Sequence, residues 1–283
     1  MLFLYAPNTL FNKIALPLRT FLLIGYFPNV KNPKTFNEKI MHRRAFKKDP
    51  RASLIADKWL VRQYVKEKGF ENILNEVYYV TDKPDTIDFD KLPERFVIKA
   101  NYASGMNIIV KDKSKLQKEK VVSKCKHWID EQDSILERAS EIHYRDIKPK
   151  IIIEEYLEEH DEYGLKDYKF WCFQGEVRYV NVHVIKNKSR LTVMYDRNWI
   201  LQPFSTGNKP MPTVTILKPP CLDRMISIAE QLSKGFSFLR VDLYCINESE
   251  IIFGELTYNS GGGTVIFLPR KYDDYFGRYL VCV

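Results

Sequence analysis

The sequence predicts an α+β fold, because hairpin-like strand pairs alternate with capped amphipathic helices. The clearest hairpin is residues 238–257, in which two apolar strands flank the polar turn Asn247–Glu250. A second strand pair surrounds Gln174-Gly175. Residues 221–233 carry apolar side chains at helical spacing and stop before Gly235. These three observations indicate antiparallel sheets packed with helices.

The length and charge of the chain limit the classes of protein to consider. With 283 residues it suits one large multi-lobed domain or two modest ones. A formal net charge of +8 fits a phosphorylated or acidic ligand, an anionic membrane surface or nucleic acid equally well. Charge alone therefore selects no partner.

The cysteines and the N-terminus indicate a cytoplasmic protein. Five scattered cysteines, at positions 125, 172, 221, 245 and 282, show no metal-ligand spacing, which favours reduced thiols and argues against structural zinc. Apolar bursts in residues 2–24 are too interrupted to span a membrane. We expect an N-terminal helix packed on the domain, with an interfacial helix near the membrane, through Lys13 and Arg19, as the alternative.

Two helices are expected in the N-terminal region. Thr35 and Glu38 form a capping box at the start of the first. Asp49-Pro50 starts the second, which is expected to run through Val65 and end near Gly69. Asp57-Lys58 lies at the edge of its apolar stripe and is by default a solvated ion pair.

The next stretch predicts a strand, a small-residue turn and a returning strand. After a short strand at 77–80, residues 96–98 lead into Lys99, the turn at 103–105 follows, and strand 107–110 returns. An ammonium beside free backbone N–H groups can bind phosphate. From these residues alone, a plain hairpin is the favoured interpretation.

The middle of the chain completes the α+β pattern. Residues 111–146 are expected to be helical, and 151–157 form a buried strand that ends in acids. Further strands are expected at 182–185 and 191–195, and the proline-rich stretch 202–220 is expected to be a loop.

The hairpin at 238–257 carries the strongest chemical signal. Arg240, Asp242 and Glu255 are predicted to face one side of it. Carboxylates on adjacent strands suit Mg²⁺, which takes one or two protein oxygens and completes its shell with water and phosphates. A cross-strand ion-pair ladder explains the same residues equally well.

In their order along the chain, these pieces resemble the ATP-grasp superfamily, and more narrowly its TupA-like branch, which is associated with teichuronopeptide and other surface-polysaccharide biosynthesis. The resemblance covers the chain from about residue 30 onward. The segments that carry it are Lys34–Lys39, Ala56–Lys58, Phe96–Lys99, Asp167–Lys169, Arg240–Leu243 and Phe253–Thr257.

The resemblance implies a nucleotide held between two α+β lobes, with an N-terminal helical region. The implied divisions are residues 1–75 (mainly helical), 76–157 (small lobe with the phosphate-covering loop) and 158–283 (central lobe with the metal hairpin). The implied residue roles are Lys58 and Lys99 on the ATP phosphates, Ser104 and Gly105 in a turn folding over them, Glu154, Tyr156 and Leu157 at the adenine, Asp167 at the ribose, Asp242 and Glu255 on Mg²⁺, and Arg240 and Lys169 in catalysis.

One position departs from the superfamily pattern. The last motif is ordinarily Glu-x-Asn, whereas this chain has Glu255-Leu-Thr257. Thr257 would be a weaker ligand, so whether one or two Mg²⁺ ions bind stays open. The glycine turn 261–263 beyond it could approach a substrate carboxylate or serve as a plain turn.

The resemblance implies an ATP- and Mg²⁺-dependent carboxylate–amine ligase that joins an amino acid to a sugar acid or a glycan-linked peptide. No Ser-His-Asp or Cys-His arrangement suggests a side-chain nucleophile. Three alternatives stay open: a small-molecule or sugar kinase on the same fold, a glycosyltransferase of polysaccharide synthesis, and a non-enzymatic basic binding protein. Nucleic acid is not expected as a partner, because many aromatic residues alternate as core strand residues do.

Overall fold

The computed structural model describes residues 18, 20–46, 49–139, 144, 146–186, 189–207 and 214–281. By their contacts, residues 50–158 form one compact unit, and residues 1–49 form another with residues 159–283. The three-part division expected from sequence stays a prediction. The alternative of an interfacial helix that contacts a membrane through Lys13 and Arg19 depends on residues outside the described ones.

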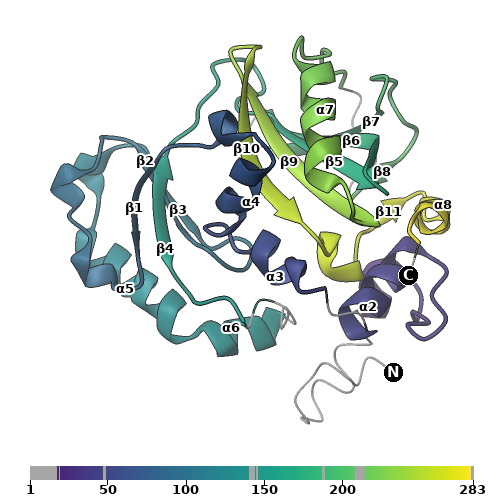
Figure 1. Ribbon diagram of the computed structural model, residues 1–283, viewed down its shortest axis with the longest axis horizontal. Coiled ribbons are helices and arrows are strands. Elements are labelled where there is room, and N and C mark those ends of the chain that lie inside the picture. The colour runs from purple at the N-terminus through teal and green to yellow at the C-terminus, as the bar shows by residue number, and fades with distance from the viewer. Residues whose placement is uncertain are drawn as a thin grey trace. The chain divides into compact units, whose positions relative to one another are not determined.

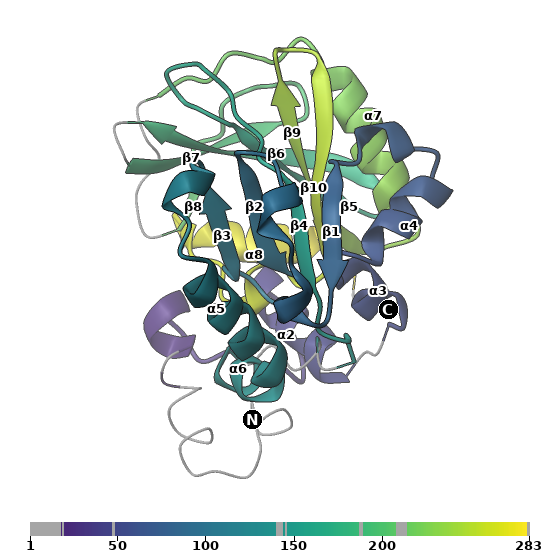
Figure 2. The ribbon, with the colours of Figure 1, turned by 90° about the vertical axis from the view of Figure 1, so that its left-hand side faces the viewer.

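The unit of residues 50–158 contains a four-stranded antiparallel sheet in the order β1-β4-β2-β3 (Figure 2). Its strands are β1 (Val77–Thr81), β2 (Phe96–Ala100), β3 (Asn107–Val110) and β4 (Ile151–Glu155). Its helices are α3 (Arg51–Ala56), α4 (Val61–Glu67), α5 (Lys118–Asp130) and α6 (Gln132–Ala139), with short 3₁₀ turns at Glu71–Ile73, Pro84–Thr86, Phe89–Lys91 and Lys113–Lys115.

Alternation along β2 separates the two faces of this sheet. Phe96 and Ile98 are fully buried and share a core cluster with Cys125 and Trp128 of α5. Lys99 points to the opposite face, since successive strand residues face opposite sides. The predicted hairpin 96–110 is confirmed, with Lys99 placed opposite Asn107.

The single helix expected over residues 49–65 is wrong. Its chain forms α3 and α4 with a break between them, and the N-cap of α3 is Pro50 rather than Asp49. The buried Asp57 causes the break, because its side chain accepts hydrogen bonds from the backbone N–H groups of Trp59 (2.8 Å) and Leu60 (3.1 Å). Asp57 is thus a local turn former and not half of a solvated surface pair.

The other unit is built on a five-stranded antiparallel sheet in the order β10-β9-β5-β6-β7 (Figure 1). Its strands are β5 (Asp167–Phe173), β6 (Glu176–Lys186), β7 (Ser189–Asp196), β9 (Phe238–Ile246) and β10 (Glu250–Thr257). A further pair consists of β8 (Ser205–Thr206) and β11 (Phe267–Leu268). Strand β8 lies within residues 202–220, which were expected to be a loop, and β11 follows the hairpin of β9 and β10. The helices are α2 (Phe36–Phe46), α7 (Leu222–Ser233) and α8 (Lys271–Tyr279), with a 3₁₀ turn at Ser260–Gly263.

The two faces of this sheet differ in polarity. Helix α7 contacts β5, β6 and β9 through a buried apolar stripe, as the sequence predicted. Leu239, Val241 and Leu243 alternate with Arg240 and Asp242 along β9. The face opposite α7 therefore carries the polar residues.

Helix α2 is joined to the C-terminal segment by the side chain of Asn37. Asn37 donates from its backbone N–H (2.9 Å) and its amide (2.9 Å) to the Asp273 carboxylate, and it also pairs with the backbone of Val265. The predicted capping box of Thr35 and Glu38 is present, with both reciprocal hydrogen bonds. Phe36 is fully buried and packs against Trp171, Phe173, Phe238, Phe267 and Phe276.

Among the described residues, no helix has the length and apolar character needed to cross a membrane.

Candidate functional site

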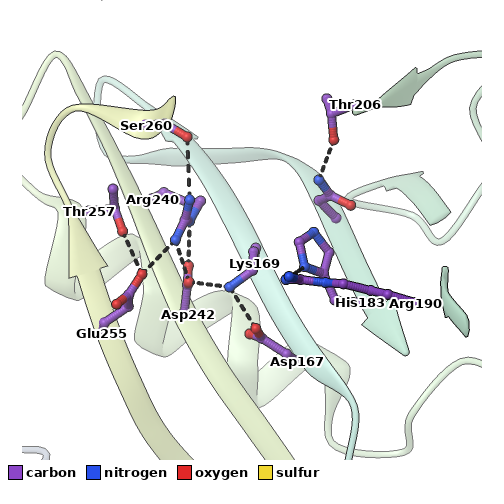
Figure 3. A network of polar contacts seen from close by, with 11 residues as sticks. Asp167, Lys169, His183, Arg190, Thr206, Arg240, Asp242, Glu255, Thr257 and Ser260 are labelled. Atoms are coloured by element: carbon purple, nitrogen blue, oxygen red, sulfur yellow. Dashed lines mark hydrogen bonds and ion pairs between the residues drawn. The ribbon is translucent and has the colours of Figure 1, made fainter. Parts of the chain in front are cut away.

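The centre of the candidate site is the guanidinium of Arg240, which binds two carboxylates. Its Nε donates to Asp242 Oδ1 (2.7 Å) and its Nη2 donates to Asp242 Oδ2 (2.6 Å) and Glu255 Oε1 (2.7 Å) (Figure 3). Glu255 lies directly opposite Asp242 in the pairing of β9 with β10, next to a register shift after Phe253. The sequence prediction that these three side chains share one side of the hairpin is confirmed.

Lys169 connects this cluster to the neighbouring strand β5. Its ammonium lies 2.5 Å from Asp242 Oδ2 and 2.6 Å from Asp167 Oδ2. Lys169 stands opposite Asp242 in the register, so strand pairing alone brings the two together. Figure 3 shows Glu255, Arg240, Asp242, Lys169 and Asp167 in one row across the sheet.

The row is electrostatically coupled. Burial alone would raise the pKa of Asp242, but Arg240 and Lys169 hold it below its ordinary value. Burial would likewise lower the pKa of Lys169, and Asp242 keeps it raised. For Asp167, burial and then the charge of Asp242 raise the pKa to about 6. Arg240 and Lys169 therefore face Asp242 as cations, and the carboxyl of Asp242 stays ionised at neutral pH.

The charges and open oxygens fit a divalent cation. Three carboxylates and two cations leave the row with an excess negative charge. Asp242 Oδ1 accepts from Arg240 Nε, and Glu255 Oε1 accepts from Arg240 and Thr257, while no contact among the described residues engages Glu255 Oε2. Each carboxylate oxygen accepts about two hydrogen bonds or metal contacts, so both groups have acceptor capacity left.

Two carboxylates are too few for a cage made of protein ligands alone. Within the described part of the chain, no group of three or more His, Cys, Asp or Glu side chains is arranged to hold a metal. Mg²⁺ commonly uses one or two carboxylates together with substrate phosphates and water. The pair Asp242 and Glu255 fits that mode of binding.

The same face continues onto β6 and β7 with residues that the sequence analysis missed. Arg190 donates to Nδ1 of His183, and Asn181 donates to Thr206 Oγ1 (2.7 Å) (Figure 3). Burial, then the charges of Lys169 and Arg190, lower the pKa of His183 to about 2, so the ring is neutral and carries its proton on Nε2. Only strand register could have revealed these residues, since His183 stands opposite Asp167 and Asn181 opposite Lys169.

In the unit of residues 50–158, Lys99 forms an ion pair with Glu154. Lys99 on β2 and Glu154 on β4 are diagonal neighbours on the sheet face opposite the α5 core. Ile109 of β3, opposite Val97, lies on the same face and is 54% exposed. This sheet face thus combines apolar side chains with an ion pair that is largely buried.

The small-residue turn is fixed at its base and exposed at its tip. Asn101 and Tyr102 are fully buried, and Asn101 makes hydrogen bonds to the backbone of Lys148 (3.0 Å) and Lys150 (2.8 Å). Ser104 and Gly105 are exposed. Ala103 and Gly105 both adopt positive φ, which allows the chain to reverse tightly.

Lys58 lies beside this turn, with its ammonium donating to the carbonyl of Ala103 (2.6 Å). Its backbone N–H also bonds to Asn101 (2.8 Å). The break between α3 and α4 therefore positions a lysine at the turn, which the sequence analysis had suggested only by resemblance. Tyr156 follows β4, with the side chains of Arg95 and Lys111 over its ring at 5.6 and 5.5 Å.

The predicted site residues thus form two described groups. Asp167, Lys169, Arg240, Asp242 and Glu255 lie together in one unit. Lys58, Lys99, Ser104, Gly105, Glu154, Tyr156 and Leu157 belong to the other. The roles assigned to them on nucleotide and metal remain predictions.

The glycine turn after the hairpin packs against α2. A Cβ on Gly263 would lie 2.6 Å from Met41 Cγ and 2.9 Å from the Asn37 carbonyl oxygen. All three glycines of the turn have positive φ. This contact supports the second of the two interpretations, a turn with a structural role.

Comparisons with solved structures find distant similarities. D-alanine–D-alanine ligase from Helicobacter pylori is 13% identical with a TM-score of 0.42, and the match covers 81% of this chain and 62% of that one. The ATP complex of D-alanine–D-alanine ligase from Bacillus anthracis gives 15% identity, a TM-score of 0.39, and 73% and 56% coverage. N5-carboxyaminoimidazole synthase from Aspergillus clavatus gives 10% identity, a TM-score of 0.42, and 72% and 44% coverage.

This chain therefore spans less than two thirds of the length of each of these three proteins. No match was found among curated proteins.

The family comparison covers most of the chain. The family described as TupA-like ATPgrasp matches residues 38–281, which include most of α2, all the named strands and every candidate site residue. The α+β fold expected from the sequence is confirmed, because the described helices pack with antiparallel sheets. The chain belongs to the TupA-like ATP-grasp family.

Proposed function

We propose that this protein is an ATP- and Mg²⁺-dependent ligase that joins a carboxylate to an amine. The observation that carries the proposal is the row Glu255–Arg240–Asp242–Lys169–Asp167, in which three carboxylates meet two largely buried cations. Family membership supplies the expectation of ATP-grasp chemistry. The row supplies the groups that such chemistry needs.

In this proposal, the unit of residues 50–158 binds the nucleotide. The sheet face that carries Lys99 and Glu154 offers apolar contacts for a base and an ammonium for a phosphate. Lys58, beside the exposed turn at Ser104 and Gly105, supplies a second ammonium. Tyr156 and Leu157 follow directly after β4, the strand that carries Glu154, and are proposed to contact the adenine.

Asp242 and Glu255 are the proposed Mg²⁺ ligands. When bound, the ion would neutralise phosphate charge and align the phosphates, as metal ions do in phosphoryl transfer. Thr257 donates its hydroxyl to Glu255 (3.0 Å), so in this structure it orients that carboxylate. A second Mg²⁺ ion would therefore meet the hydroxyl of Thr257 at the position where the superfamily pattern has the side-chain amide of Asn.

The remaining residues act by positioning and charge. A substrate carboxylate attacks the γ-phosphate to give an acyl phosphate and ADP, and an amine then displaces phosphate to form the amide. Arg240 and Lys169 are fixed by Asp242 and aimed along the polar face, where charge develops in both steps. Asp167 is proposed to bind the ribose hydroxyls through its Oδ1, which has no partner in the described structure.

The substrates are proposed from the family association with teichuronopeptide and surface-polysaccharide synthesis. The acceptor would be a uronic acid or a glycan-linked peptide, and the amine an amino acid. Since ATP is available in the cytoplasm, we place the reaction there. The β6–β7 end of the polar face, with Arg190 exposed beside His183, offers a cation to an anionic substrate.

The test is phosphate release from ATP and Mg²⁺ with pooled amino acids, with and without pooled uronic acids and their nucleotide-linked forms. Release that requires both pools supports the ligase. Turnover of ATP with the sugar pool alone, together with transfer of its phosphate to a sugar hydroxyl, would show a kinase and contradict the ligase proposal. A protein whose melting temperature does not respond to ATP would contradict nucleotide binding itself, since ligands that bind the native state must stabilise it.

A further inference from the structure

Two cysteines far apart in the sequence lie side by side behind the polar face. Cys221 is the N-cap of α7, and Cys245 is the penultimate residue of β9. Their Sγ atoms are 2.6 Å apart, although 24 positions separate the residues in the chain. Both belong to the same compact unit.

The two thiols differ in access. Cys221 is half-buried, whereas Cys245 is only 5% exposed. A reagent from solution therefore reaches Cys221 first. Cys245 lies directly behind it, in the position of a resolving thiol.

Their surroundings favour the thiolate at Cys221. The hydrogen bond from Cys245 is the main cause that lowers the pKa of Cys221, and Arg224 adds to it. The amino end of α7, a helix of 12 residues, favours negative charge at its N-cap. For Cys245 the same hydrogen bond and burial raise the pKa, so the proton resides there.

The other described cysteines lack these features. Cys125 and Cys172 are fully buried, and burial raises their pKa values to about 11 and about 12. Buried, protonated thiols react slowly with disulfides. The chemistry is therefore selective for one pair among the described cysteines.

We propose that Cys221 and Cys245 form a reversible disulfide by exchange with a low-molecular-weight disulfide. The Cys221 thiolate attacks one sulfur of the reagent, forming a mixed disulfide and releasing one small thiolate. Cys245 then attacks the Cys221 sulfur, loses its proton, and releases the second small molecule as a thiol. The two cysteines together lose two electrons, and the reagent gains both.

The cross-link joins the start of α7 to β9, the strand that carries Arg240 and Asp242. A disulfide needs its sulfurs about 2 Å apart, so the two thiols require little movement. Closing the loop between residues 221 and 245 restricts the unfolded chain and raises the melting temperature. Composition alone suggested only unpaired reduced thiols, because the pairing depends on packing of α7 against the sheet.

The experiment incubates the full chain with glutathione disulfide and maps tryptic peptides without reduction. Cys221 and Cys245 fall in different peptides, residues 198–224 and 241–270, because Lys209 and Lys218 precede proline. The expected product is these two peptides linked and two hydrogen atoms lighter. Accumulation of a stable glutathione adduct on Cys221, or linkage of either residue to Cys282, would overturn the proposal.

Variants and melting curves test the same pair in the folded protein. Oxidation should raise the melting temperature by several degrees, and a reducing agent should reverse the shift. Cys221→Ser should abolish it, whereas the control Cys125→Ala should retain it. An equal shift in Cys221→Ser would overturn the proposal. The peptide map uses the chain without substitutions, so it tests the proposal even if a variant folds poorly. Neither the peptide map nor the melting curve depends on the proposed ligase activity.

Discussion

Arg240 and Asp242 lie two residues apart on β9, and the guanidinium of the first donates to both carboxylate oxygens of the second, at 2.7 and 2.6 Å. Residues i and i+2 of a strand share a face, so the local sequence dictates this contact. Asp242 is only 1% exposed and depends on Arg240 and Lys169 for its charge balance. The pair is therefore both the proposed reaction centre and a stability element.

Arg240→Met should destabilise the fold by about 3 kcal/mol or more, because it leaves a buried carboxylate with one cation fewer. Urea unfolding measures this. Arg178→Met is the matched control, since Arg178 pairs with Glu176 two residues away on β6 but both are exposed, and it should cost under about 1 kcal/mol. Equal costs for the two variants would contradict the buried role of Arg240.

Arg240→Lys should recover part of the stability but little of the activity. A lysine restores the charge without the planar fork that reaches both oxygens of Asp242. The measurement compares unfolding free energy with ATP-dependent phosphate release in the same preparation. Recovery of both together would show that charge alone is sufficient.

Glu255→Gln should remove most of the Mg²⁺-dependent part of the melting shift caused by ATP, and Asp242→Asn should do the same. Each change replaces a proposed charged ligand by a neutral one of equal size. The shift is measured with ATP and Mg²⁺ and again with ATP and a chelator. Glu250→Gln, at the exposed start of β10, is the control that should keep the full shift. A full shift in both site variants would disprove the metal assignment.

Lys99→Met should weaken ATP binding by at least about tenfold, as expected when a charge-assisted contact to phosphate is lost. It should leave the fold intact, because the core face of β2 is unchanged. Lys118→Met removes a lysine from an exposed ion pair with Asp90 in the same unit and should leave ATP binding unchanged. Titration by calorimetry distinguishes the two.

The parts predicted from sequence are those that local chemistry determines. The capping box of Thr35 and Glu38, the hairpin with Asn247 in its turn, and the shared face of Arg240 and Asp242 all depend on residues a few positions apart. Periodicity and turn preference act at that range. The helix break at Asp57 also depends on local contacts, but it was not predicted because the residues on both sides of Asp57 follow a helical pattern.

The parts that were missed depend on long-range pairing. Asn37 contacts Asp273 across 236 positions, so no local pattern could assign its role. His183 and Arg190 join the polar face only because β5, β6 and β7 pair in one particular register. Cys221 and Cys245 meet because α7 packs on β9. A single sequence does not encode register or packing partners in a form that periodicity reveals.

His183 should make the protein acid-sensitive in a defined range. Its pKa is about 2 in the folded state against an ordinary 6.5, so below pH 6.5 the unfolded state binds the extra proton and stability falls as pH decreases. From about pH 7.5 to about pH 5.5 this one group should remove about 1.4 kcal/mol.

His183→Gln should lose that share of the pH dependence, because glutamine does not titrate. The measurement is the free energy of unfolding at both pH values. His160 is exposed, so His160→Gln removes a histidine without altering the Arg190 contact and is the control. An unchanged pH dependence in His183→Gln would mean that the folded ring accepts a proton readily.

Gly263→Ala should destabilise the unit that contains the hairpin by more than backbone strain alone. Gly263 has a φ of +86°, and its added Cβ would lie 2.6 Å from Met41 Cγ and 2.9 Å from the backbone oxygen of Asn37. Placing a non-glycine residue in the left-handed region costs about 1–2 kcal/mol by itself. Displacing α2 would add to that cost.

Gly25→Ala separates the two contributions. Gly25 has a φ of +79°, and a Cβ added there would have nothing within 4 Å, so alanine meets only the backbone cost. We expect Gly263→Ala to exceed Gly25→Ala by about 1–3 kcal/mol in unfolding free energy, the usual cost of forcing atoms into a packed site. Equal losses would show that α2 adjusts freely, and the glycine turn would then be available for the substrate contact that the sequence left open.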